Sequence, residues 1–206
     1  MALIAIDDKK EYDLNNMNVA AQNIEMGTYL KNLATTYERT GGSGTLFDDL
    51  FFPLTAGKVG VVDQPPFSTT EIAYLFPQNN PSHIIYIIGQ MPHSWALGTD
   101  IQPHIHWKQT TAGSVVFKID YKWFNLGENV PANFNTYVMA SPLFPYTSGS
   151  IAQLTTGSAK ISGSHISEES SMLLVKLYRD DNTYTGNAVT YQFDIHIEKD
   201  ALGSPD

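Results

Sequence analysis

The residues best suited to chemistry are three histidines in two stretches that alternate polar and apolar residues. His104 and His106 stand two residues apart in PHIHWK, and His196 follows Asp194 by two residues in FDIHIEK. Because the side chains of a β-strand alternate between its two faces, each of these pairs is expected to share one face. Neutral imidazoles are common ligands of transition metals, and carboxylates also bind them, so this pattern could hold an ion.

Two other interpretations compete with a catalytic ion at these histidines. The order His-x-His…His is similar to the ligand order of cupins, but Trp107 and Lys108 follow His106 in place of the expected glutamate motif. Lys108 also shares the histidine face, where an ammonium group would repel a dication. The histidines could instead form hydrogen bonds within a sheet, or hold a structural ion on an oligomer axis. The sequence thus predicts a polar network or an ion at four residues, with no catalytic residue and no cofactor: His104, His106, Asp194 and His196.

Other catalytic arrangements are disfavoured. Glu168-Glu169 and Asp180-Asp181 are adjacent pairs, so on a strand their carboxylates would point to opposite faces and could not act as a glycosidase pair. The chain has no G-x-S-x-G sequence for a serine nucleophile. It also has no cysteine, which excludes disulfides, thiolate zinc ligands and a cysteine nucleophile. We therefore expect a protein that is not an enzyme.

Three tryptophans, Trp95, Trp107 and Trp123, stand in or near the first histidine stretch. Aromatic side chains can stack on a sugar, and together with the Ser/Thr/Gly-rich residues 146–165 they would suit a carbohydrate-binding module. More often such residues fill a sandwich core or a subunit interface. Ligand stacking and packing of the β domain both stay open.

The elements that must position these side chains are predicted to be strands. In the stretch 102–124, two alternating segments flank Thr110 to Gly113, a plausible hairpin turn because glycine supplies a positive φ. Further strand-length segments lie at 84–89, 135–140, 159–164, 172–179 and 189–198. The first of these is an uninterrupted apolar run, which predicts a strand covered on both faces.

This spacing of short strands and turn residues is typical of a sandwich or jelly roll. Aromatic residues make up 12% of the chain and charged residues only 16%, which agrees with large contact surfaces between sheets. We predict an all-β fold, an antiparallel sandwich or jelly-roll-like domain, over residues 46–206.

Residues 1–45 follow a different pattern. Between residues 11 and 40, apolar residues recur in steps of three and four with two asparagines in the same row, which predicts a helix. The helix could pack on its own domain or against symmetry mates. The Gly-rich residues 40–45 are a linker by composition, so 1–45 is predicted to be an N-terminal arm. Its expected oligomer or docking residues are Val19, Met26, Leu30, Leu33 and Tyr37.

Charge and hydropathy limit the partners. The net charge of −9, without a basic cluster, disfavours contact with a phosphate backbone. No apolar run approaches the 18 or so residues of a membrane span, and the first residues lack the basic and long apolar regions of a signal peptide. We expect a soluble protein with no nucleic-acid and no membrane partner.

Six sequence blocks, in this order, resemble a group of tailed-bacteriophage and prophage virion structural proteins. They are LFDDLFFPL (46–54), QMPHSW (90–95), TDIQPHIHW (99–107), IDYKW (119–123), SSMLLVKLYRD (170–180) and FDIHIEKDALGS (193–204). The family pattern ends in a DIHY–DTLGS element, where this chain has Ile197 in place of Tyr and Ala201 in place of Thr. The resemblance spans about residues 46–204 and leaves out the predicted arm.

The resemblance implies a β-sandwich module of a phage particle. We expect a structural role in capsid decoration, a connector, a fibre base or a tail baseplate. The protein would associate with itself, as a homotrimer, and dock on capsid or tail components of a virion that assembles in the host cytoplasm. Two alternatives stay open: a carbohydrate-binding receptor module of the virion, and a cupin-like metal-dependent enzyme.

Overall fold

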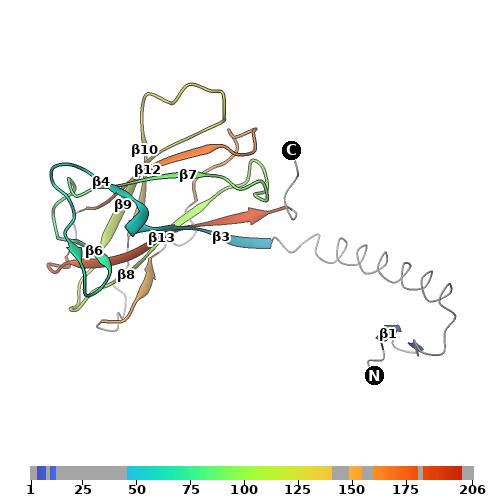
Figure 1. The fold of residues 1–206 in the computed structure, drawn as a ribbon, viewed down its shortest axis with the longest axis horizontal. Helices are drawn as coiled ribbons and strands as arrows, with labels where there is room; N and C mark the ends of the chain where they lie inside the picture. Colours follow the sequence, from blue (N-terminus) through green and yellow to red (C-terminus); the bar gives the residue numbers. More distant parts are fainter. Residues whose placement is uncertain are drawn as a thin grey trace. The chain divides into compact units, whose positions relative to one another are not determined.

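The computed structural model describes residues 4–7, 10–12, 46–140, 149–154, 160–180 and 183–200. The chain divides into two units, residues 1–45 and 46–206, which are described separately. In the first unit, strand β1 (Ile4–Asp7) pairs antiparallel with β2 (Lys10–Tyr12) (Figure 1). Residues 11 and 12 of the predicted helix therefore belong to β2. The rest of that helix, the Gly-rich linker and the docking residues Val19, Met26, Leu30, Leu33 and Tyr37 lie outside the described residues.

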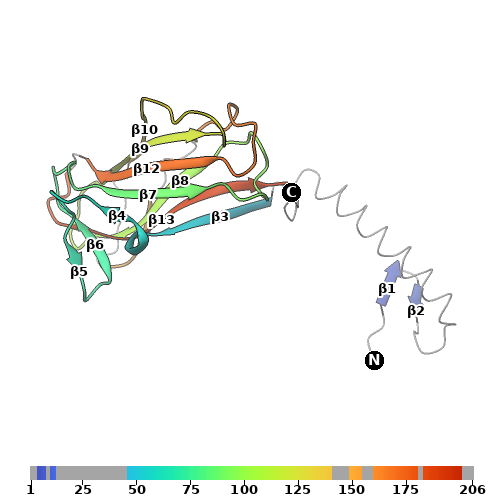
Figure 2. The same ribbon diagram turned by 45° about the horizontal axis from the view of Figure 1, so that its top comes forward.

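The second unit is a sandwich of two antiparallel sheets, seen as two layers in Figure 2. The five-stranded sheet has the order β10-β9-β12-β7-β4, with β4 (Lys58–Val59), β7 (Ile85–Gln90), β9 (Val116–Phe124), β10 (Asn135–Ala140) and β12 (Met172–Arg179). The six-stranded sheet has the order β11-β8-β13-β6-β5, with β5 (Phe67–Ser68), β6 (Ala73–Phe76), β8 (Gln102–Lys108), β11 (Ala152–Leu154) and β13 (Ala188–Lys199). Strand β3 (Leu46–Pro53) also pairs with β13, and a short 3-10 helix, η1 (Leu54–Ala56), follows it.

Eight of these strands are connected as a jelly roll. The first strand of the set pairs with the last (β3 with β13) and the second with the seventh (β7 with β12). The third pairs with the sixth (β8 with β11) and the fourth with the fifth (β9 with β10). Nested pairing of this kind rolls a chain into two packed sheets. The predicted all-β antiparallel sandwich is therefore confirmed.

The core lies between the sheets and follows the period-two alternation of the strands. In β12, Leu173, Val175 and Leu177 are buried, while the residues between them face outward. Burying one side of each strand supplies the hydrophobic driving force that holds the layers together. No helix in the described ranges is long and apolar enough to cross a membrane.

A buried arginine closes one end of the sandwich. Arg179, the last residue of β12, donates hydrogen bonds to the carbonyl oxygens of Phe76 (2.7 Å) and Gly186 (2.6 Å), and also to that of Tyr184. Burial lowers the pKa of the guanidinium to about 10, which leaves it charged at neutral pH. One charged side chain thus joins β12, the end of β6 and the segment before β13.

The predicted hairpin over 102–124 is wrong. Strands β8 and β9 lie in different sheets, and each pairs with other partners. The intervening segment crosses from one sheet to the other, where the Gln109 side chain donates to the carbonyl oxygens of Thr111 (2.9 Å) and Gly113 (3.0 Å). A turn sequence with glycine suits such a crossing as well as a hairpin, so the local pattern did not distinguish them.

Two other strand predictions are also corrected. In β7, Ile85 and Ile87 are buried but Ile88 is 70% exposed, so the apolar run is covered on one face only. This follows from a two-layer sandwich, in which each sheet packs on a single side. Among the described residues of the predicted strand at 159–164, Ile161 forms only an isolated bridge with Ile101.

Candidate functional site: a histidine and carboxylate cluster

Strand β13 lies between β8 and β3, and this arrangement assembles the site. Across one ladder Asp194 lies opposite His104 of β8, and across the other His196 lies opposite Asp49 of β3. The alternate residues of these strands, such as Ile105 and Ile195, are fully buried in the core. Therefore the histidines and carboxylates share the face of the sheet that points away from the core.

Asp194 forms the inner part of the cluster. Its Oδ2 lies 2.9 Å from His106 Nε2 and 3.3 Å from His104 Nε2. Asp194 and His104 are each only 1% exposed. Burial by itself raises the pKa of Asp194, but the hydrogen bonds from His104 and Gln192 and the electrostatic effect of the neighbouring histidines outweigh it, so the pKa lies below its ordinary value. The group is thus a carboxylate that holds two imidazole rings.

Asp49 and His196 form the outer part. His196 Nε2 lies 3.1 Å from Asp49 Oδ1, and about one third of each side chain is exposed. Burial and the neighbouring His104 lower the pKa of His196 despite the opposing effect of Asp49. The ring centroids of His104 and His196 are 4.2 Å apart, so the inner and outer parts are in contact.

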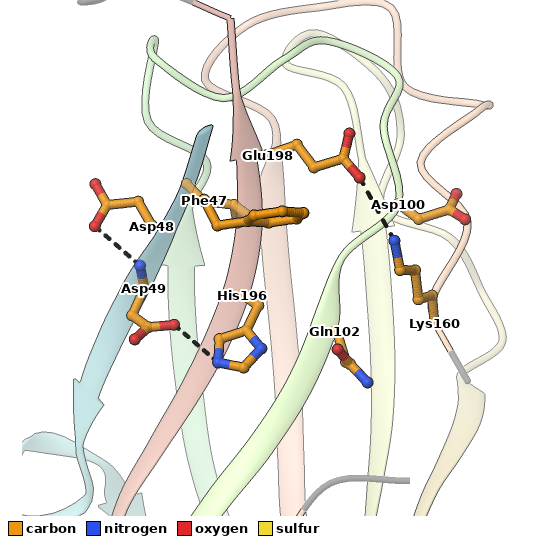
Figure 3. A pocket seen from close by; sticks show the side chains of 9 residues that line it. Phe47, Asp48, Asp49, Asp100, Gln102, Lys160, His196 and Glu198 are labelled. Carbon is orange, nitrogen blue, oxygen red and sulfur yellow. Dashed lines mark hydrogen bonds and ion pairs between the residues drawn. The ribbon is translucent and has the colours of Figure 1, made fainter. Parts of the chain in front are cut away.

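A groove of about 470 Å³ opens beside the outer part (Figure 3). Figure 3 shows Asp49 and His196 at its wall, with Lys160 and Glu198 paired across it at 3.5 Å. Four carboxylates and one ammonium group line it, which makes it attractive to cations. The lining residues are Phe47, Asp48, Asp49, Asp100, Gln102, Lys160, His196, Ile197 and Glu198.

Within the described ranges, two overlapping sets of side chains could hold a metal ion. One set is His104, His106 and Asp194, and the other is Asp49, His104 and His196. In each set the ligand atoms lie within 4.8 Å of one another. The structure therefore brings together all four residues that the sequence singled out, and it adds Asp49.

In the sequence, the ammonium group of Lys108 argued against a metal ion beside the histidines. The structure pairs its Nζ with Glu71 Oε2 at 2.6 Å, and Tyr191 donates to the same oxygen at 2.9 Å. The ammonium charge is thus balanced beside the cluster. Neither Glu71 nor Asp49 was predicted, because nothing local in the sequence relates β3 or residue 71 to the histidine strands.

The three tryptophans lie in the core. Trp95, Trp107 and Trp123 are 2–3% exposed. Trp123 Nε1 donates to Ser171 Oγ (3.0 Å), and the rings of Trp95 and Trp123 pack with centroids 5.2 Å apart. Their burial fits packing of the β domain, and none of them presents a ring face to a ligand from solvent.

Comparisons with known proteins give a fold likeness only. No family model and no curated protein matches the chain. A xylan-binding module, CBM15, is similar with a TM-score of 0.41 and 9% identity over 77% of this chain and 100% of that one. The structure of infectious bursal disease virus, Gx strain, has a TM-score of 0.36 and 7% identity over 77% of this chain and 33% of that one. The CBM22-1-GH10 modules of Clostridium thermocellum xylanase 10B reach 0.32 and 14% identity, over 73% and 28% of the two chains. These scores are too low to support an argument about function.

Proposed function

We propose that this chain is a structural protein of a bacteriophage particle, which acts through self-association and docking rather than catalysis. The observation that carries the proposal is the series of six ordered sequence blocks that resembles phage virion proteins. Five of them coincide with the framework of the sandwich, namely β3, β8, β9, β12 and β13. The resemblance thus involves the strands that build the fold and the histidine cluster, which supports a shared module.

Exposed apolar side chains support a role in assembly. On the outer face of the five-stranded sheet, Tyr86 and Ile88 of β7 and Val138 of β10 are exposed. On the edge strand β3, Phe47 and Phe51 are exposed as well. The exposed apolar residues within β7, and those within β3, share one face of their strand, and neighbouring exposed apolar side chains are typical of contact sites between proteins. We infer that such surfaces contact other copies of the chain, as a homotrimer, and capsid or tail components in the virion.

The proposal is tested by measuring the mass of the full chain in solution and by labelling purified virions. We expect a trimer at micromolar concentration by sedimentation, and specific labelling of particles by an antibody against residues 46–206. Ile88→Lys is expected to weaken assembly, whereas Val61→Lys, at an exposed loop position, serves as the matched control. A monomer that is also absent from purified virions contradicts the proposal.

A carbohydrate-binding receptor module is the second candidate, and one observation favours it. The exposed ring of Phe47 lies in the same groove as Gln102 and Asp100, and an apolar ring beside polar side chains suits a sugar. Glycan-array binding that Phe47→Ala abolishes would support this candidate. Absence of binding to host surface glycans would remove it.

A further inference from the structure

The contact with Asp194 determines which nitrogen of His104 carries a hydrogen. A carboxylate only accepts hydrogen bonds, so the Nε2 atoms of His104 and His106 that face Asp194 Oδ2 are the donors. A neutral imidazole that carries its proton on Nε2 keeps a lone pair on Nδ1. In His104 this Nδ1 atom is buried, and it has no hydrogen-bond partner in the part of the chain that the structure describes.

A buried lone pair without a partner costs free energy, and a cation would satisfy it. Asp49, His104 and His196 have ligand atoms within 4.8 Å of one another. The 3.1 Å between Asp49 Oδ1 and His196 Nε2 is close to the ~3.3 Å that separates two ligands of a tetrahedral ion with bonds of about 2.0–2.1 Å. This one distance is thus as short as a shared ion requires, and the third ligand atom, from His104, lies within 4.8 Å of both.

We propose that Asp49, His104 and His196 bind one divalent transition-metal ion, such as Zn²⁺. Asp194 would hold the His104 ring through the nitrogen that does not bind the metal, as carboxylates do for many metal-bound histidines. Imidazole and carboxylate donors together favour zinc and its neighbours over magnesium and calcium. The ion would join β8, β13 and β3, and its binding does not depend on the proposed role in a virion.

The acidic groove beside the outer part of the cluster gives a cation access to the proposed site. Asp49 and His196 line the acidic groove, so a cation can reach them from solvent. His104 belongs to both sets, so the other members decide: neither His106 nor Asp194 lines that groove, and Asp194 is buried and already paired with both imidazoles. We therefore assign the metal to the outer set.

The test titrates the chelator-treated full chain with Zn²⁺ by calorimetry, and with Co²⁺ by visible absorption. We expect one ion per chain and a tetrahedral Co²⁺ spectrum. His196→Gln and Asp49→Asn should each weaken binding more than about 100-fold, because removing even an outer hydrogen-bond partner of a ligand commonly costs 10–100-fold. Both positions are partly exposed, so these variants should fold, which circular dichroism would verify.

Two further variants complete the test. His93→Gln is the matched control, because His93 is exposed to the same degree and also faces a carboxylate, Glu169, at 3.9 Å outside the cluster. It should leave Zn²⁺ affinity unchanged, and His106→Gln should change it by less than about tenfold. The proposal is overturned if the chain binds no Zn²⁺ or if His196→Gln and Asp49→Asn bind like wild type. Loss of binding in His106→Gln but not in His196→Gln would equally overturn it.

Discussion

Asp49 Oδ1 and His196 Nε2 lie 3.1 Å apart across the ladder of β3 and β13, although β3 opens the sandwich domain and β13 closes it. The contact exists because the first and last strands of the jelly roll are neighbours. It places a carboxylate of β3 beside the histidine cluster that β8 and β13 build. The chemistry of the site is thus a consequence of the topology.

If the outer cluster binds zinc, the metal should stabilise the folded chain. A ligand that binds only the native state at about 100 times its dissociation constant adds about 2.7 kcal/mol to the free energy of unfolding. Urea unfolding with and without Zn²⁺ measures this, and excess chelator should reverse it. His196→Gln should show no gain, and a gain of the same size in that variant would contradict the assigned ligands.

Removing Asp194 should destabilise the protein more than removing Asp49. Asp194→Ala leaves the buried His104 Nε2 without its acceptor, and a buried unsatisfied polar group costs about 1–3 kcal/mol. Asp49→Ala breaks only a partly exposed pair, which is worth about 0–1 kcal/mol. Denaturant unfolding without metal compares the two variants, and equal losses would show that Asp194 does not hold the cluster.

Arg179 should be irreplaceable by lysine. Its guanidinium donates to three carbonyl oxygens at once, and a lysine ammonium cannot reproduce that planar arrangement. Arg179→Lys is therefore expected to lower the free energy of unfolding by about 1–3 kcal/mol for each carbonyl oxygen that loses its donor. Lys176→Arg, at an outward-facing position of the same strand, is the control and should be nearly neutral. A stable Arg179→Lys variant would contradict this view of the sandwich end.

The Glu71 carboxylate should make the protein less stable in acid. Hydrogen bonds from Lys108 and Tyr191 lower the pKa of Glu71 below its ordinary value of 4.5. The folded state therefore binds this proton less readily than the unfolded state. The stabilising contribution is complete above pH 4.5 and is lost as the pH falls through the lowered pKa.

Urea unfolding between pH 6 and pH 3 measures this contribution. Glu71→Gln should lose less stability over that range than wild type does. The lowered pKa values of Asp48 and Glu128 leave part of the slope in place. Identical slopes in the two proteins would show that the Lys108 contact does not persist in solution.

The strand character of the histidine stretches and the pairing of their polar residues on one face could be predicted from local sequence patterns. Period-two alternation is a local property of the backbone, so it correctly predicted that His104 and His106 share one face of their strand and that Asp194 and His196 share one face of theirs. The spacing of strands and turns likewise predicted an all-β sandwich. These predictions needed no knowledge of which strands are neighbours.

The choice of neighbouring strands could not be predicted in this way, because it depends on how the whole chain packs. The hairpin expected over 102–124 is instead a crossing between sheets, because β8 pairs with β13 and β11 while β9 pairs with β12 and β10. Asp49 entered the site and Glu71 balanced Lys108 through contacts between distant segments. Pairing between such segments depends on the packing of the whole core, and no periodicity in a single strand encodes it.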